Sequence, residues 1–154
     1  MLKRVFLLAC FLLALSLTAL AVPVAAVESQ AVVPDDLQWN PNADIAGVES
    51  AIAIGDPAGS ELYVLLGKMD EGTVFPAHVH PDNRITTVLS GVMYYGTGAQ
   101  FEPDNAQPYP TGSVVYTPAG VPHYMWSKEG ELVAQETGYG PTGLEFMVAD
   151  AESE

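Results

Sequence analysis

From residue 48 onward, apolar residues occur in short runs and not at helical spacing. The runs are rich in β-branched and aromatic side chains, and glycine, proline, aspartate and asparagine separate them. They cover residues 48–54, 61–68, 73–80, 85–91, 92–98, 112–117, 123–128, 132–139 and 144–149. No segment after residue 48 has the capped, amphipathic pattern of a helix of several turns. The pattern predicts an almost all-β domain whose short strands form a sandwich or a barrel.

Two segments of the chain lack this strand pattern. Residues 27–47 are rich in proline, aspartate and asparagine, and predict a leader or linker in front of a domain that spans residues 48–150. Residues 97–111 contain Pro103, Pro108 and Pro110, and predict the longest irregular segment of the domain, on its surface.

Residues 1–26 begin with Lys3 and Arg4, continue as an apolar run and end in small residues at Ala26. This pattern predicts a secretory signal peptide that is cleaved near Ala26. We therefore expect a periplasmic or extracellular protein with no stable membrane span after cleavage. Two alternatives remain, because residues 5–27 are long enough for a retained membrane anchor, and Cys10 follows a short lipoprotein-like sequence.

The chain is strongly acidic, with a formal net charge of −14, and all 19 of its acidic residues follow residue 26. Such a charge repels nucleic acid and anionic lipid but attracts cations, so we expect no nucleic-acid partner. Most of these carboxylates fit a solvated surface. Cys10 is the only cysteine, so the domain has neither a disulfide nor a cysteine nucleophile, and its stability must come from a packed core.

The three histidines are the clearest candidates for chemistry. His78 and His80 are one residue apart on a predicted strand, so both side chains lie on the same face and could bind one metal ion. His123 follows a second turn at residues 118–122 and begins another strand. An HxH pair is also common among histidines that are only hydrogen-bonded or exposed, so the pair by itself leaves both interpretations open.

The spacing around these histidines resembles the two motifs of the cupin superfamily. The first motif consists of a glycine, any five residues, the pattern HxH, a short gap, a residue that is usually glutamate, any six residues and a second glycine. It is matched by Gly72, His78, His80, position 84 and Gly91. The second motif consists of a glycine, any five residues, the pattern PxG, any two residues, a histidine, any three residues and a last residue that is often asparagine. It is matched by Gly112, Pro118, Gly120 and His123, with Ser127 in the last position.

This resemblance implies an antiparallel jelly-roll barrel, or double-stranded β-helix, with a metal ion near its centre. It assigns His78, His80 and His123 as ligands of one divalent transition metal ion: Fe, Mn, Ni, Cu or Zn. It also implies a small-molecule ligand or substrate and a possible homodimer. Fold and activity are loosely tied. The protein could be a small-molecule oxygenase or isomerase, or a non-catalytic module that binds or senses a small ligand or metal, and no catalytic residue is identified.

Arg84 departs from the motif, because it stands where the family usually has a glutamate ligand. A guanidinium has only donors and stays charged, so it cannot bind a metal ion. It could face the cavity and bind an anionic substrate beside the metal. It could instead point outward and pair with an acid such as Asp82, in a surface contact worth about 0–1 kcal/mol. In a third interpretation the site is degenerate and binds no metal.

Gln135 and Glu136 are adjacent on a late strand, so one of them should face the interior of the barrel. A buried Glu136 could take the place of the missing ligand, but the sequence around it does not indicate which of the two faces inward.

Overall fold

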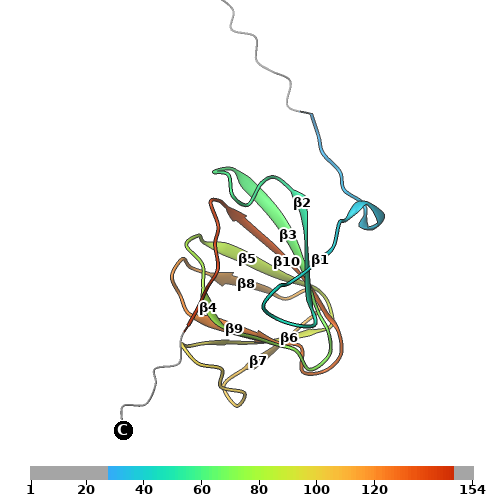
Figure 1. The fold of residues 1–154 in the computed structure, drawn as a ribbon. Coiled ribbons are helices and arrows are strands. Elements are labelled where there is room, and N and C mark those ends of the chain that lie inside the picture. The colour runs from blue at the N-terminus through green and yellow to red at the C-terminus, as the bar shows by residue number, and fades with distance from the viewer. Residues whose placement is uncertain (1–27, 148–154) are drawn as a thin grey trace, which may run out of the picture.

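The computed structural model describes residues 28–147 and has two β-sheets that face each other (Figure 1). Within these residues the helical structure is a single 3-10 turn at Pro34–Asp36. In the same part of the chain, no helix is long and apolar enough to cross a membrane. The predicted signal peptide, residues 1–26, lies outside the described residues.

The first sheet has six antiparallel strands. In spatial order they are β1 (Asn40–Pro41), β2 (Val48–Ile54), β3 (Leu62–Met69), β10 (Leu132–Tyr139), β5 (Arg84–Ser90) and β8 (Val114–Thr117). The second sheet has five, in the order β11 (Glu145–Phe146), β4 (Val74–Val79), β9 (His123–Trp126), β6 (Val92–Thr97) and β7 (Gln107–Pro110). Strand β10, late in the chain, lies between β3 and β5 and pairs with both. This arrangement confirms the predicted all-β, antiparallel jelly-roll barrel.

The core lies between the two sheets, where the inward-facing residues of both meet. Its buried members are Val48, Met69, Val88, Met93, Tyr95, Met125 and Leu132. Burying an apolar side chain of this size contributes about 1.5–3 kcal/mol. The domain has no disulfide, so this packing supplies its stability, and it also forms the floor of the cavity described below.

Each of the nine predicted runs contains a strand, and two further strands were not predicted. Strand β7 lies inside residues 97–111, so the expectation of an entirely irregular segment there is wrong. Pro108 and Pro110 belong to β7, which pairs with β6 and is the outermost strand of the second sheet in the described part of the chain. Proline is tolerated there because the outer side of an edge strand needs no N–H donor.

Strand β1 lies within the segment predicted to be a linker. Asn40 and Pro41 pair with Ser50 and Glu49 of β2, so the first sheet begins before residue 48. The neighbouring Asn42 lines the internal cavity.

Candidate metal centre

The fold brings the three predicted histidines together. His78 lies in β4 and His123 begins β9, and the two residues are directly opposite each other in the second sheet. His80 follows β4 immediately. One ring nitrogen of each histidine lies within 4.8 Å of the others, and the residues are buried, with 0%, 9% and 2% exposure for His78, His80 and His123. His80 and His123 belong to different motifs and are 43 positions apart in the sequence, yet they lie in one cluster.

In all three histidines the Nδ1 atom faces a backbone carbonyl. The distances are 2.7 Å from His78 to Pro76, 2.5 Å from His80 to Gly143 and 2.9 Å from His123 to Val121. A carbonyl oxygen can only accept, so each Nδ1 carries the proton and each Nε2 keeps its lone pair. The Nε2 atom of His78 is buried and has no hydrogen-bond partner among the described residues.

The electrostatics of the cluster favour neutral imidazoles. Burial, followed by the charge of His123, lowers the pKa of His78 to about 3. Burial also lowers the pKa of His80 and of His123, and the positive charge of Arg84 acts in the same direction on both. Neutral imidazoles with a free Nε2 are the form that binds a metal ion. The donor set therefore fits a divalent transition metal ion.

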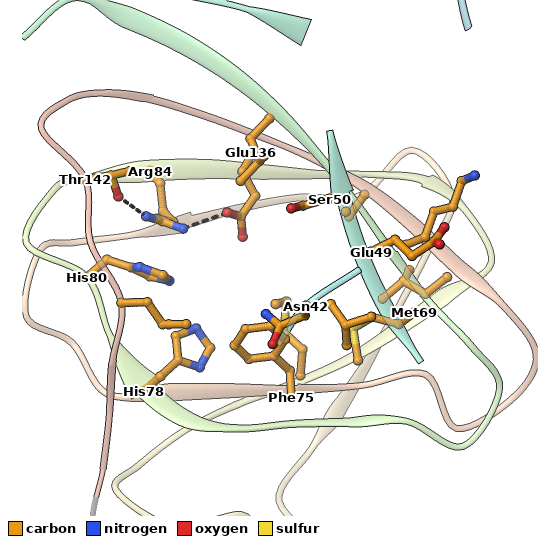
Figure 2. Close-up of a pocket in the computed structure, with 18 of the residues that line it drawn as sticks. Asn42, Glu49, Ser50, Met69, Phe75, His78, His80, Arg84, Glu136 and Thr142 are labelled. Atoms are coloured by element: carbon orange, nitrogen blue, oxygen red, sulfur yellow. Dashed lines mark hydrogen bonds and ion pairs between the residues drawn. The ribbon is translucent and has the colours of Figure 1, made fainter. Parts of the chain in front are cut away.

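A cavity of about 310 Å³ extends from His78 and His80 into the barrel (Figure 2). Its wall is apolar over much of its area, with Val48, Leu65, Met69, Phe75, Met125 and Leu132. Its polar side chains include Arg84, Glu136 and Thr142 near the histidines, and Glu49 and Ser50 farther from them. Asn42 and Lys68 also line the cavity, and Lys68 is the strand neighbour of Glu49. A small molecule in this cavity would have one end beside the histidines and would contact a largely apolar wall beyond it.

Arg84 faces this cavity and is 4% exposed. Its Nη1 atom donates to Glu136 Oε2 at 2.6 Å, and its Nη2 atom contacts Asp82 Oδ1 at 3.1 Å and Thr142 Oγ1 at 2.6 Å. The interpretation in which Arg84 points out of the barrel is therefore wrong, although its pairing with Asp82 is present. Contact of Arg84 with an anionic substrate stays a prediction.

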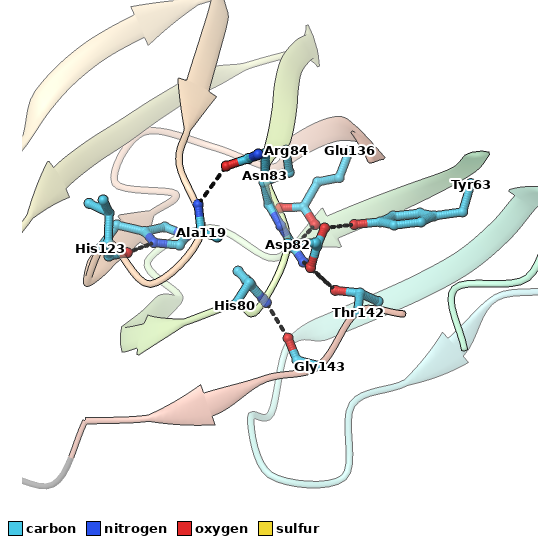
Figure 3. A network of polar contacts seen from close by, with 11 residues as sticks. Tyr63, His80, Asp82, Asn83, Arg84, Ala119, His123, Glu136, Thr142 and Gly143 are labelled. Carbon is cyan, nitrogen blue, oxygen red and sulfur yellow. Dashed lines mark hydrogen bonds and ion pairs between the residues drawn. The ribbon is translucent and has the colours of Figure 1, made fainter. Parts of the chain in front are cut away.

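The guanidinium belongs to a larger buried network (Figure 3). Asp82 accepts hydrogen bonds from the Tyr63 hydroxyl, at 2.6 Å, and from the Thr142 hydroxyl. Burial raises the pKa of Asp82, but the hydrogen bonds from Thr142 and Tyr63 and the charge of Arg84 outweigh it and hold that pKa below its usual value. Burial and the hydrogen bond to Asp82 raise the pKa of Tyr63 to about 12. The network therefore contains two carboxylates, one guanidinium and neutral hydroxyls.

The loops that carry the two motifs are also joined directly. The Ala119 N–H donates to Asn83 Oδ1 at 2.9 Å, and the Gly120 N–H donates to the His80 carbonyl at 2.9 Å. These bonds fix the turn after His80 against the turn before His123, and so set the distance between the two halves of the cluster.

Sequence reasoning left the direction of Glu136 open and missed Tyr63 and Thr142. Glu136 faces inward, in line with Leu132 and Ala134 of β10, which also line the cavity. Gln135 instead bonds to Thr137. No local signal identifies Tyr63 or Thr142, because their roles depend on contact with Asp82, which is 19 residues from Tyr63 and 60 from Thr142.

Residues 65–135 match the family model of the cupin domain, and this range contains His78, His80, Arg84 and His123. The barrel is a cupin domain. A comparison with curated protein sequences found no match. Within the cupin fold, the chain thus keeps the three histidines of the motifs and has an arginine in the fourth position.

Solved structures share this fold at low sequence identity. The polyketide cyclase RemF from Streptomyces resistomycificus is 14% identical over 81% of this chain and 89% of its own, with a TM-score of 0.66. A sugar phosphate isomerase from Silicibacter pomeroyi is 18% identical over 72% and 76%, with a TM-score of 0.60. An RmlC-like cupin from Shewanella frigidimarina is 13% identical over 73% and 91%, with a TM-score of 0.58.

Proposed function

We propose that this cupin domain binds one divalent transition metal ion through His78, His80 and His123 and holds a small molecule beside it. The observation that carries the proposal is that three buried imidazoles converge, each with its Nδ1 fixed on a carbonyl and its Nε2 left as a ligand atom. Fe, Mn, Ni, Cu and Zn all accept imidazole ligands. When bound, the ion would act as a Lewis acid or as a carrier of dioxygen.

The chain's own residues would perform the remaining tasks. The carbonyls of Pro76, Val121 and Gly143 orient the imidazoles, as hydrogen-bond partners of metal-bound histidines do in other proteins. The apolar cavity wall excludes water from the bound molecule and positions it. Glu136 and Arg84 provide charged groups at the end of the cavity nearest the histidines.

The first test is metal content. We expect the purified protein to contain, or to take up, about one equivalent of metal by elemental analysis, and the variant with His78→Gln, His80→Gln and His123→Gln to bind none. Tyr95→Phe is the matched control, since the Tyr95 ring stacks on His123 at 5.5 Å but offers the site no ligand atom. Equal metal content in the wild type and the triple variant would refute the proposal.

Within this proposal an enzyme is the first candidate, either an oxygenase or an isomerase of small molecules. Two structural relatives, a polyketide cyclase and a sugar phosphate isomerase, carry the names of enzymes, which supports this choice by analogy. The alternative is a module that captures or senses a small ligand or the metal. Oxygen consumption by the metal-loaded protein with a panel of small organic substrates separates the oxygenase from the other candidates.

We also propose that the domain is exported and cleaved near Ala26, on the basis of the pattern in residues 1–26. The N-terminal sequence of the protein recovered from the periplasm or medium tests this. A mature protein that begins close to residue 27 fits cleavage, whereas an intact N-terminus in the membrane fraction fits the anchor.

Finally, we propose a homodimer through the outer face of the first sheet. Exposed apolar side chains lie there at Ile85, Leu89, Val114, Tyr116 and Tyr139. Ile85 and Tyr116 are direct neighbours on β5 and β8, and no charged side chain alternates with these residues on the outward face of β5, β8 and β10. In a strongly acidic protein, this face lets two copies approach with little charge repulsion.

A further inference from the structure

Glu136 is a carboxylate on the cavity wall, close to the histidine cluster. It lies in the middle of β10 and points into the cavity (Figure 2). Its side chain is 14% exposed. Among the described residues its hydrogen bond is the one from Arg84 to Oε2. This leaves Oε1 available as an acceptor for a molecule in the cavity.

Arg84 is less available than Glu136. Its two terminal nitrogens contact one carboxylate each, Glu136 and Asp82, and Thr142 accepts a further hydrogen bond from Nη2. Asp82 is in turn held by the Tyr63 hydroxyl (Figure 3). An anion that bound the terminal nitrogens of Arg84 would have to displace Glu136 or Asp82 and would meet their negative charge. Two negative charges in contact repel each other strongly in a poorly solvated site. The Nε atom of Arg84 has no hydrogen-bond partner among the described residues, but it is buried.

The side chains that contact Arg84 also disfavour an anion beside its guanidinium. Arg84 contacts two carboxylates, Asp82 and Glu136, so these three side chains together have a formal charge of −1. A bound divalent ion would add a charge of +2, so the choice between an anion and a neutral molecule depends on the position of Glu136 and not on the net charge of the site. At the other end of the cavity Glu49 and Lys68 are opposite each other in the register of β2 and β3, so one negative and one positive charge lie on neighbouring strands there. A metal ion then attracts a lone pair of the bound molecule, while Glu136 attracts a hydrogen-bond donor.

We propose that Glu136, held in place by Arg84, is the specificity-determining residue of this cavity. The molecule it recognises is uncharged or cationic, with an oxygen or nitrogen lone pair for the ion and a hydroxyl or amine hydrogen for the carboxylate. Its remaining part is apolar and contacts side chains such as Leu65, Phe75 and Leu132. This inference rests on the proposed metal and small-molecule function, and it replaces the expected anion contact at Arg84 with a donor contact at Glu136.

The test uses two probes that differ in one group. Both 2-pyridinemethanol and picolinate offer a pyridine nitrogen and an oxygen to a metal, but the first carries a hydroxyl and the second a carboxylate. Each is titrated into the Co²⁺-loaded full-length protein, and binding is followed by the visible absorption of Co²⁺ and by calorimetry. Affinities are divided by those of the same probes for aqueous Co²⁺. We expect the wild type to favour 2-pyridinemethanol on this corrected scale.

The decisive variant is Glu136→Gln, which has nearly the same shape without the charge. We expect it to weaken the binding of 2-pyridinemethanol by about tenfold or more, since a hydrogen bond to a charged group is lost. We expect the same variant to bind picolinate more tightly than the wild type does. Glu49→Gln is the matched control, because it removes the same charge at the other end of the cavity, and it should change neither affinity (Figure 2). Glu136→Asp keeps the negative charge but has a side chain that is shorter by one methylene, so its carboxylate reaches less far into the cavity. It should weaken the binding of 2-pyridinemethanol without strengthening that of picolinate.

Three results would overturn the inference: a corrected preference of the wild type for picolinate, no response of the Co²⁺ spectrum to 2-pyridinemethanol, or equal effects of Glu136→Gln and Glu49→Gln. Loss of Co²⁺ binding by the wild type would be a different result, because it refutes the proposed function and the inference falls with it. The Co²⁺ content of each variant, measured before the titrations, separates these cases.

Discussion

At the scale of single residues, burial decides the protonation state of the site. His78 is fully buried, its Nδ1 faces the Pro76 carbonyl and its pKa lies near 3 because burial, and then the charge of His123, disfavour the protonated form. The same physical cause lowers the pKa of the other two histidines. The folded chain therefore presents neutral imidazoles, whereas the unfolded chain protonates them near the usual pKa of 6.5.

This difference predicts that acid weakens the metal-free fold. Between the unfolded pKa of 6.5 and the folded pKa of His78, about 3, the unfolded chain binds more protons, so the free energy of unfolding falls as the pH falls. The loss is at most about 1.4 kcal/mol per pH unit for each histidine. Urea denaturation at pH 7 and pH 5 measures it, in a range above the titration of most carboxylates. The variant with all three histidines changed to Gln is the control, and an unchanged pH dependence in it would contradict the prediction.

Arg84 leads to a second prediction at this scale. Arg84→Met would leave Asp82 and Glu136 without their cation, and removing one partner of a buried ion pair typically costs about 3–5 kcal/mol. We expect a loss of this size in the free energy of unfolding, measured by urea denaturation at pH 7. Glu129→Gln is the control, since Glu129 accepts an exposed hydrogen bond from Tyr94 and its loss should cost less than about 0.5 kcal/mol. Equal losses in the two variants would show that the Arg84 network does not stabilise the fold.

At the scale of the strands, alternation and tight turns position the site. Alternation along β10 directs Leu132, Ala134 and Glu136 into the cavity. The turn between β5 and β6 depends on Gly91, whose φ is +83° and whose added Cβ would lie 2.3 Å from the Glu131 carbonyl oxygen. The second glycine of the first motif is thus required by the backbone, because no side chain fits between this turn and the chain just before β10.

Gly91→Ala should therefore be one of the more damaging glycine substitutions. A left-handed backbone costs a residue with a side chain about 1–2 kcal/mol, and the backbone clash adds to this, so we expect a loss of roughly 2–4 kcal/mol. Gly112→Ala is the control, since its φ is +90° but nothing lies within 4 Å of the added Cβ. Gly112→Ala should therefore lower the free energy of unfolding only by the cost of the left-handed backbone. Thermal unfolding of both variants gives the comparison, and an equal loss in both would contradict the clash at Gly91.

At the scale of the whole molecule, charge and exposed apolar surface are separated. The chain has a formal net charge of −14, yet the outward face of β5 and β8 carries exposed Ile85, Val114 and Tyr116 without a charged neighbour on that face. An uncharged apolar patch on a highly charged protein is typical of a protein–protein interface. The proposed homodimer would cover it, sheet against sheet, and leave the cavity inside each barrel.

The homodimer predicts a defined effect of charge on this face. Val114→Lys combined with Tyr116→Lys should shift the protein from dimer to monomer, because the lysines of two copies would be desolvated and would face one another. Light scattering coupled to size-exclusion chromatography measures the mass. Val33→Lys is the control, since Val33 is 54% exposed in the segment before β1, outside the proposed interface. A wild type that is monomeric at all concentrations would refute the dimer.

Most of the architecture could be predicted from the sequence because its signals are local. Strands were indicated by short β-branched and aromatic runs, and turns by glycine and proline, so each predicted run contains a strand. Strand β7 was missed because Pro108 and Pro110 are normally strand breakers, and only the position of β7 at a sheet edge makes them tolerable. The three histidines were found because each stands next to a turn with a recognisable spacing.

The sequence by itself determined the strand pattern, the two motifs that contain the three histidines, and the presence of an arginine in the fourth motif position. Tertiary structure decided what that arginine does. Its partner Glu136 is 52 residues away, and the Thr142 hydroxyl is 58 residues away. They meet because β10 inserts between β3 and β5. Alternation within a strand is a local property that a sequence can display, whereas the charge that a buried guanidinium meets depends on which distant strand becomes its neighbour.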